Sequence, residues 1–143
     1  PSWAETQKLY TRPQWGRVYT EINTTKGDNS MKNDCLFCAI IDGEIPSKKL
    51  YEDALCYAFY DIEPQAPVHF LVVPKEHICC AAKIDESNEA IVAHCFTVIA
   101  KLCKELGCES YRIVNNCGDQ AGQTVKHLHF HVLSGRDMTW PPG

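Results

Sequence analysis

The sequence contains no apolar run that approaches the roughly 18–20 residues needed to cross a bilayer. It begins without the apolar core of a secretory signal peptide. It also has no excess of positive charge, since 14 Lys and Arg stand against 18 Asp and Glu, for a net charge of −4. The first two absences predict a cytoplasmic protein, or one shared between the cytoplasm and the nucleus. The third argues against binding to nucleic acid by general electrostatics, although it does not exclude a single bound nucleotide.

Internal repeats and low-complexity tracts are also missing, and 143 residues are enough for one domain with a sizeable core. Residues 1–30 have no sustained period of 2 or 3.6. We expect them to be an N-terminal extension, either native or added for expression, and residues 31–143 to form the single domain.

Cysteine, in contrast, is abundant, with nine residues in the chain. The number is odd and no signal peptide leads to an oxidising compartment, so a disulfide scaffold is not expected. Cysteines inside apolar runs behave as small hydrophobic residues. The spacing of Cys35 and Cys38 indicates chemistry instead, and Cys117 is expected to be sensitive to oxidation.

Apolar periodicity predicts one short and one long helix, over residues 36–41 and 85–106. The stripe of the long helix consists of Ile91, Cys95, Val98, Ile99, Leu102 and Leu106. Strands are expected over residues 48–52, 55–60, 68–73, 111–115 and 127–133. Tight turns between the early strands indicate an α+β domain built on a five-stranded antiparallel sheet.

The last predicted strand carries three histidines, His127, His129 and His131, which alternate with Leu128, Phe130 and Val132. Because side chains alternate faces along a strand, the histidines share one face and the apolar residues the other. Packing alone rarely places three histidines on one face. We therefore expect a metal site or an array of catalytic imidazoles. Two other histidines are interpreted differently, His69 as a structural residue and His94 as a solvated one.

The loop over residues 116–124 leads directly into this strand and contains two glycines, amide side chains and a hydroxyl. Glycines allow backbone N–H groups to approach an anion closely, and such groups bind phosphate oxygens. The loop is therefore predicted to bind phosphate beside the histidines.

Several separated motifs resemble one known family. They are Glu44–Pro46, Phe59–Ile62, Pro64–Pro67, His69–Lys75, the three histidines and Trp140–Gly143. Over residues 35–143 the chain resembles the histidine triad (HIT) nucleotide-binding proteins, and within them the Hint branch of nucleoside phosphoramidases. The resemblance implies a HIT-like fold and a homodimer with a continuous sheet. In such dimers the segment with Trp140 reaches toward the active site of the partner subunit.

The same resemblance implies catalytic roles for residues of this chain. His129 becomes the nucleophile that forms a covalent nucleotidyl-imidazole, and a neutral imidazole suits that task. His131 and the N–H groups of Gly122 to Thr124, Gln123 included, stabilise the phosphoryl oxygens. The Thr124 hydroxyl touches the phosphate or the leaving group, and His127 helps to orient the array.

Roles in nucleoside binding are implied in the same way, for purine nucleotides such as AMP, GMP and their phosphoramidates. Asp61 accepts hydrogen bonds from the ribose hydroxyls, since an ionised carboxylate suits that task. Ile45 and Phe59 flank the base, and Asn116 reaches the phosphate or the ribose. Without the resemblance, Ile45 and Phe59 would be interpreted as core residues and Asp61 as a turn-capping acid.

A zinc site is implied by the relatives that carry a Cys-x-x-Cys pair. Cys35 and Cys38 need two further ligands for a closed tetrahedral site, and those relatives suggest His77 and His127. The zinc is then structural, and no organic cofactor is expected. The alternative is a pair of reduced thiols packed at the start of a helix.

The leading hypothesis is therefore an enzyme that cleaves the P–N bond of purine nucleoside 5′-phosphoramidates. A dinucleoside polyphosphate hydrolase and a nucleotide-sensing scaffold with little turnover are the alternatives. A hydrolase with an open catalytic zinc held by the three histidines is less favoured, because no water-activating base lies near them in the sequence.

Overall fold

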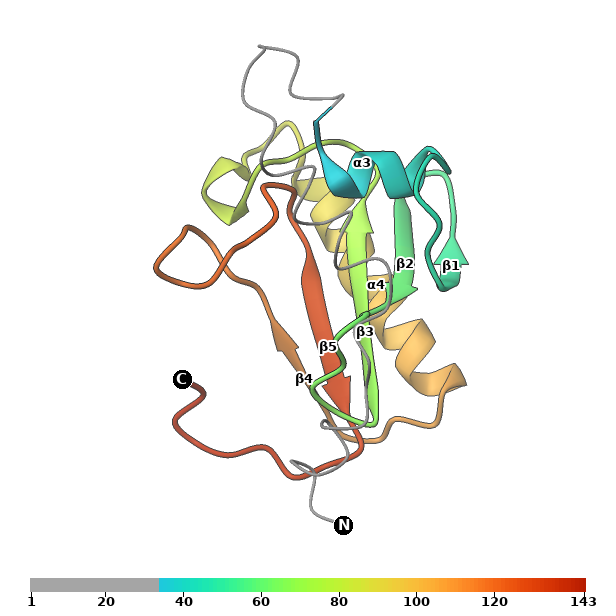
Figure 1. The fold of residues 1–143 in the computed structure, drawn as a ribbon, viewed down its shortest axis with the longest axis vertical. Coiled ribbons are helices and arrows are strands. Elements are labelled where there is room, and N and C mark those ends of the chain that lie inside the picture. The colour runs from blue at the N-terminus through green and yellow to red at the C-terminus, as the bar shows by residue number, and fades with distance from the viewer. Residues whose placement is uncertain (1–33) are drawn as a thin grey trace. The chain divides into compact units, whose positions relative to one another are not determined.

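The computed structural model describes residues 34–143, so the predicted extension over residues 1–30 lies outside the described part of the chain. Its elements, labelled in Figure 1, are α3 (Leu36–Ile41), β1 (Lys49–Glu52), β2 (Cys56–Tyr60), β3 (Val68–Pro74), the 3-10 helix η1 (Ala81–Lys83), α4 (Glu89–Glu105), β4 (Tyr111–Val114) and β5 (Phe130–Ser134).

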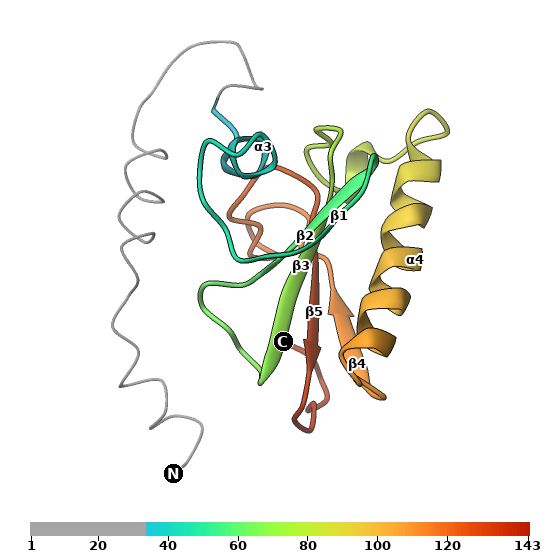
Figure 2. The same ribbon diagram turned by 90° about the vertical axis from the view of Figure 1, so that its right-hand side faces the viewer.

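The five strands form one sheet in the order β1-β2-β3-β5-β4, and every neighbouring pair is antiparallel. The predicted α+β architecture is thus confirmed. Figure 2 shows α4 along one face of the sheet and α3 on the other side, near one end of the strands. Helix α4 links β3 to β4, which lie apart in the sheet with β5 between them.

The main core lies between the sheet and α4. Its strand residues alternate with residues of the opposite face, as the period of 2 requires. The buried cluster contains Cys56, Ala58, Phe70, Val72, Leu128, Phe130 and Val132 from the sheet side and Cys95, Val98, Ile99, Leu102 and Cys103 from the helix. The opposite face is therefore left for the histidines.

The long helix is shorter than predicted at its N-terminus, where it begins at Glu89 instead of residue 85. Asp85 belongs to a preceding turn, because its carboxylate accepts hydrogen bonds from the N–H and hydroxyl of Ser87. Leu106, predicted on the buried stripe, is the C-cap and is 37% exposed. An apolar stripe is buried only where the helix packs against another element. Leu106 follows the last turn of α4, where this residue stays partly exposed.

Four of the five predicted strands agree with the observed bounds to within one residue at each end. The exception is the last, since β5 begins at Phe130 rather than at residue 127. Before Phe130 the chain runs against the segment that follows β3, where the Leu128 N–H donates to the Ile78 carbonyl at 2.6 Å. The nine cysteines are all free. No helix of residues 34–143 is long and apolar enough to span a bilayer.

Candidate active site

The three histidines lie on the face of the sheet away from α4, as the alternation predicts. Their rings follow one another, with the centroids of His129 and His131 5.1 Å apart. Phe37 of α3 packs edge-on against His129 at 5.1 Å and against His127 at 6.0 Å. His127 and His129 are buried, and His131 is half-buried. The irregular start of the strand therefore does not disturb the alternation of faces.

The tautomer of His129 follows from its partner. Its Nδ1 lies 2.7 Å from the His127 carbonyl oxygen, which can only accept, so Nδ1 carries the proton. The lone pair of the neutral ring is then on Nε2. Among the described residues, 34–143, no group forms a hydrogen bond with Nε2. His129 presents an unprotonated nitrogen to an incoming group.

The tautomer of His131 follows from a longer chain of hydrogen bonds. The Gln65 N–H donates to Nδ1 of His69 at 3.0 Å, so a neutral His69 carries its proton on Nε2. That Nε2 donates to Nδ1 of His131 at 2.9 Å. The remaining proton of His131 is therefore on its own Nε2. The two neighbouring rings present opposite groups, a lone pair on His129 and an N–H on His131.

Burial keeps both rings neutral near pH 7, because it penalises the charged imidazolium. It lowers the pKa of His131 to about 4, with the neighbouring His129 and His69 adding to the effect. It also lowers the pKa of His129, although the bond to the His127 carbonyl and the charge of Asp61 oppose it. Both tautomers derived above thus persist over the physiological range.

Asp61 lies beside His69 and His131 and is half-buried. Its Oδ2 is 3.4 Å from Nε2 of His69 and 3.7 Å from Nδ1 of His131. Its Oδ1 accepts the Glu63 N–H at 2.7 Å, so the residue also has the turn-capping role that the sequence suggested. Burial raises the pKa of this carboxyl, which the Glu63 N–H and the His69 ring partly offset.

The loop over residues 116–124 uses most of its polar groups internally. The Gln123 side chain is buried, accepts the Gly118 N–H at 3.0 Å, and donates to the carbonyls of Cys79 and Val125 at 2.8 and 3.0 Å. The N–H groups of Gly122 and Gln123 donate to the carbonyls of Asp119 and Gly118. Gln123 therefore holds the loop together.

The Thr124 residue at the end of this loop remains available. Thr124 is exposed, and among the described residues its N–H and hydroxyl have no hydrogen-bond partner. The Asn116 side chain faces the loop, with its Nδ2 3.9 Å from the position that a Cβ on Gly122 would take. Asn116 and Thr124 therefore present polar atoms at the two ends of the loop.

The predicted base-contacting residues lie close to the histidines in two elements. Phe59 of β2 is buried and its ring meets that of Phe37 at 5.4 Å. Ile45 follows α3, is half-buried, and donates its N–H to the Ala39 carbonyl at 3.3 Å. Phe59 therefore adjoins the aromatic side chain, Phe37, that packs on His129.

The four residues of the predicted zinc site converge. Their potential ligand atoms, from Cys35, Cys38, His77 and His127, all lie within 4.8 Å of one another. Nδ1 of His127 is 3.3 Å from Sγ of Cys35 and 3.5 Å from Sγ of Cys38. Nδ1 of His77 is 3.4 Å from Sγ of Cys38. Ligand sulfur and nitrogen around tetrahedral zinc are about 3.5 Å apart, given bonds of about 2.3 and 2.0 Å.

The orientation of His127 also fits a metal ligand. Its Nε2 donates to the Pro74 carbonyl at 2.8 Å, which leaves the lone pair of Nδ1 directed at the two sulfurs. The donor set and its spacing thus fit zinc. The three triad histidines, in contrast, do not converge as one ligand group. His131 groups instead with Asp61 and His69, so the open catalytic metal held by the triad has no support among residues 34–143.

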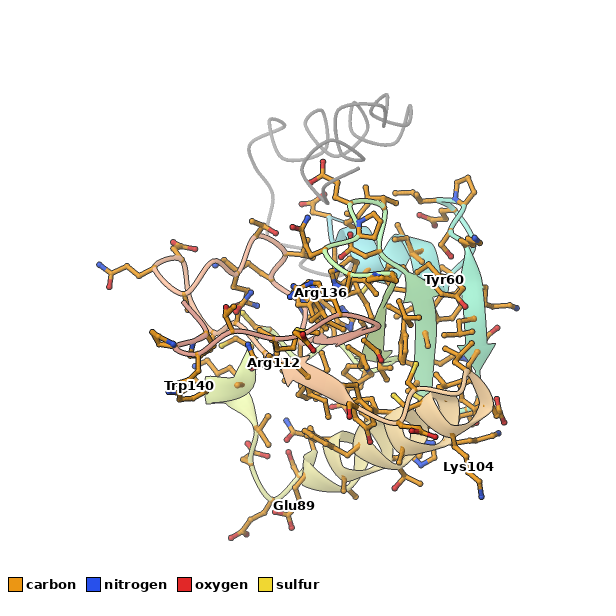
Figure 3. All side chains as sticks on the ribbon, turned by 90° about the horizontal axis from the view of Figure 1, so that it is seen from below. Tyr60, Glu89, Lys104, Arg112, Arg136 and Trp140 are labelled. Carbon is orange, nitrogen blue, oxygen red and sulfur yellow. The ribbon has the colours of Figure 1, made fainter. Side chains whose placement is uncertain are left out.

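The environment of His94 differs from its prediction, whereas the predicted role of Trp140 involves a second copy of the chain. His94, interpreted as solvated, binds the Asp53 carboxylate through its Nε2 at 2.6 Å and ties α4 to the turn before β2. Trp140 is 82% exposed, and the neighbouring Thr139 carbonyl accepts a hydrogen bond from Arg112 of β4. Figure 3 shows Arg112 and Trp140 on the same side of the molecule.

Sequence reasoning missed three residues that shape the site. His69 orients His131, Phe37 packs on His129, and Asn115 donates its side-chain N–H to the His129 carbonyl at 2.8 Å. His69 was interpreted as a structural residue only, and its contact with His131 depends on the register of β3 against β5, in which Leu71 stands opposite His131. That register is a tertiary property, and no local pattern reveals it.

Comparison with known proteins places these features in a family. The family model described as "HIT domain" matches residues 42–138. An uncharacterized HIT-like protein of Synechococcus elongatus is 45% identical over 114 residues, which are 79% of this chain and all of that protein. The crystal structure of a HIT family hydrolase from Legionella pneumophila has a TM-score of 0.74 and 43% identity, covering 76% of this chain and 99% of that one. A histidine triad protein from Clostridium difficile has a TM-score of 0.72 and 46% identity, covering 78% and 97%.

Proposed function

The chain belongs to the HIT domain family, and we propose that within it the chain hydrolyses purine nucleoside 5′-phosphoramidates through a covalent intermediate at His129. Such activity corresponds to the Hint branch. The observation that carries the proposal is the pair of opposed tautomers, a free lone pair on Nε2 of His129 beside an N–H on Nε2 of His131. A nucleophile and an oxyanion donor are the two groups that phosphoryl substitution needs.

The first step forms the intermediate. Nε2 of His129 attacks the α-phosphorus, the P–N bond breaks, and the leaving amine takes a proton from solvent, to which the water of the second step later returns one. The ring becomes positively charged once it bears the nucleotidyl group. Its Nδ1–H already donates to the His127 carbonyl, and this bond stabilises the charge as it develops.

The second step releases the nucleotide. Water attacks the phosphorus, the bond to Nε2 breaks, and the nucleoside monophosphate leaves with the neutral ring restored. In both steps the N–H of His131 donates to a phosphoryl oxygen, helped by the Thr124 N–H and hydroxyl. His69 keeps this N–H directed outward, because it occupies Nδ1 of His131.

Residues around the histidines are proposed to bind the nucleoside part of the substrate. Asp61 accepts hydrogen bonds from the ribose hydroxyls, Asn116 contacts the phosphate or the ribose, and Ile45 and Phe59 contact the purine. The Phe37–Phe59 ring pair supports this, because Phe37 also packs on His129 and so places an apolar surface beside it. No organic cofactor is needed in either step.

A structural zinc is proposed at Cys35, Cys38, His77 and His127. When bound, the ion cross-links α3 and the segment after β3 to the start of the triad and takes no part in the reaction. The matching ligand distances and the bond from His127 to the Pro74 carbonyl support this assignment.

A homodimer with a continuous sheet is proposed as the assembled form. Two features support it. β4 is an edge strand of the sheet, and large apolar side chains of α4 and β4, Phe96 and Tyr111, are 46% and 39% exposed. Unpaired edge strands are templates for pairing with another chain. The exposed Trp140 would then extend toward the partner's site.

The test is turnover of adenosine 5′-phosphoramidate, followed as release of AMP and ammonia. We expect release by the wild type and a loss of about 1,000-fold or more in His129→Ala, with AMP binding by calorimetry retained. His94→Ala, a histidine outside the site, is the matched control and should keep its turnover. Full turnover by His129→Ala would contradict the mechanism. Binding of AMP without any release would point to a nucleotide sensor, and preferred cleavage of diadenosine polyphosphates to the other enzymatic alternative.

A further inference from the structure

Three thiols outside the triad and outside the zinc ligands gather beside the loop over residues 116–124. Cys80 lies in the segment after β3, and the thiols of Cys79 and Cys117 are close enough to its sulfur to influence its pKa. Cys117 is exposed, and Cys79 and Cys80 are half-buried. The cluster therefore joins two segments that are far apart in the sequence, and solvent reaches it.

The backbone around the cluster is held by one side chain. The carboxamide of Gln123 donates to the Cys79 carbonyl and accepts from the N–H of Gly118, the residue after Cys117. One chain neighbour of each cysteine, Cys79 for Cys80 and Gly118 for Cys117, is thus bound to the buried Gln123 side chain. The two segments that carry Cys80 and Cys117 therefore approach each other through defined hydrogen bonds.

The surroundings of the Cys80 sulfur favour the thiolate, which is the form that attacks an oxidant. Burial alone would raise its pKa, but the N–H groups of Ala82 and Lys83 that face it and the neighbouring thiols bring the pKa below the ordinary value. The ammonium group of Lys126 lies within electrostatic range of Cys79 and Cys80. Thiolates, not thiols, react with oxidants, and cationic surroundings favour them.

We propose that Cys80 and Cys117 are a redox modification site, which hydroperoxides convert to a disulfide that slows turnover at His129. The thiolate of Cys80 attacks the peroxide oxygen, the O–O bond breaks, and a sulfenic acid and water or an alcohol form. The Cys117 thiol then displaces hydroxide from that sulfur, and the S–S bond forms with release of water. Two electrons pass from the sulfurs to the peroxide, and a dithiol reductant reverses the change.

The disulfide affects the active site by displacing residues of the loop over residues 116–124. A disulfide holds its sulfurs about 2.05 Å apart, so Cys117 must move toward Cys80. Gly118 follows Cys117 and is bonded to Gln123 through both its N–H and its carbonyl. A shift of Gly118 therefore displaces Gln123 and the adjoining Thr124. The effect on turnover rests on the proposed function, whereas formation of the disulfide does not.

The first experiment maps the bond without any activity measurement. The full chain, loaded with zinc to protect Cys35 and Cys38, is treated with hydrogen peroxide and digested for mass spectrometry without reduction. We expect a cross-linked peptide pair containing Cys80 and Cys117 and a mass loss of about 2 Da, because two hydrogens leave. Cys117→Ser should lose the cross-link, and Cys108→Ser, a half-buried cysteine outside the cluster, should keep it. Absence of the pair, or cross-linking of Cys80 to Cys79 instead, would overturn the proposal.

The second experiment measures phosphoramidate turnover before and after oxidation. A misplacement of about 1 Å can cost up to about 100-fold in rate, so we expect a fall of about tenfold that dithiothreitol reverses. Cys117→Ser should resist the fall, while Cys108→Ser should show it. An equal fall in Cys117→Ser would overturn the regulatory part. An inactive reduced enzyme that still forms the Cys80–Cys117 bond would instead contradict the proposed function alone.

Discussion

At the scale of single residues, the site depends on which nitrogen of each imidazole carries a proton. Two carbonyl groups and one backbone N–H decide this, because a carbonyl only accepts and an N–H only donates. The His127 carbonyl fixes His129, the Pro74 carbonyl fixes His127, and the Gln65 N–H fixes His69 and through it His131. The chemistry of the side chains is thus set by the backbone.

His69→Ala tests the last of these links. Without His69, Nδ1 of His131 loses its donor and the ring can take either tautomer, so the outward N–H is no longer guaranteed. We expect kcat for phosphoramidate hydrolysis to fall by about 10- to 100-fold while AMP affinity changes little. Steady-state kinetics and calorimetry measure the two quantities. An unchanged kcat would show that His131 keeps its tautomer without His69.

The pH dependence follows from the lowered pKa values. Protonation of His129 removes the nucleophilic lone pair, and protonation of His131 alters the hydrogen bond with His69. Burial lowers the pKa of both rings, and that of His131 to about 4. Activity should therefore stay level from neutral pH to below the ordinary histidine range, near 6.5, and fall as the pH approaches 4. A kcat/KM profile that falls with a midpoint near 6.5 would contradict the assigned environment.

At the scale of elements, α3 is a helix of only six residues, yet it contributes to two sites. Cys35 is its N-cap and Cys38 lies in its first turn, while Phe37 between them packs on His129. So short a helix has little stability of its own and depends on tertiary contacts. The proposed zinc, when bound, would add to the packing of Phe37 in holding α3 against the sheet.

Cys35→Ser tests this anchor. We expect the wild type to bind about one zinc per chain, as a four-ligand structural site should, and the variant to bind far less. The melting temperature should fall with it, because metal that binds only the folded chain stabilises it. Elemental analysis and calorimetry provide the measurements, with Cys108→Ser as the control. A wild type without zinc after refolding in its presence would contradict the assignment.

At the scale of the whole molecule, the sequence was sufficient for the sheet, both helices and the shared face of the three histidines. Those features depend on local periodicity, which the strand residues Leu128, Phe130 and Val132 display plainly. Local periodicity did not predict the contacts between segments that are distant in the sequence. The approach of His69 to His131 depends on the register of β3 against β5, and the internal role of Gln123 depends on the approach of two loops.

The assembly proposed for the whole molecule is tested by its mass in solution. Light scattering should give twice the mass of one chain. Replacing the exposed Phe96 by Lys places a charge on the apolar part of α4 and should shift the protein toward the mass of a single chain. Glu89→Lys, at the start of the same helix, is the control. A single-chain mass for the wild type would exclude the dimer.

The hydrogen bonds of the loop over residues 116–124 have a consequence for its motion. The N–H groups of Gly118, Gly122 and Gln123 are all bonded within the loop, although it contains no helix or strand. Such a segment opens as one cooperative unit, and its amide protons exchange with deuterium only when it opens. These three amides should therefore exchange slowly and at similar rates. Thr124, directly beside them, should exchange rapidly, because its N–H has no hydrogen-bond partner among residues 34–143.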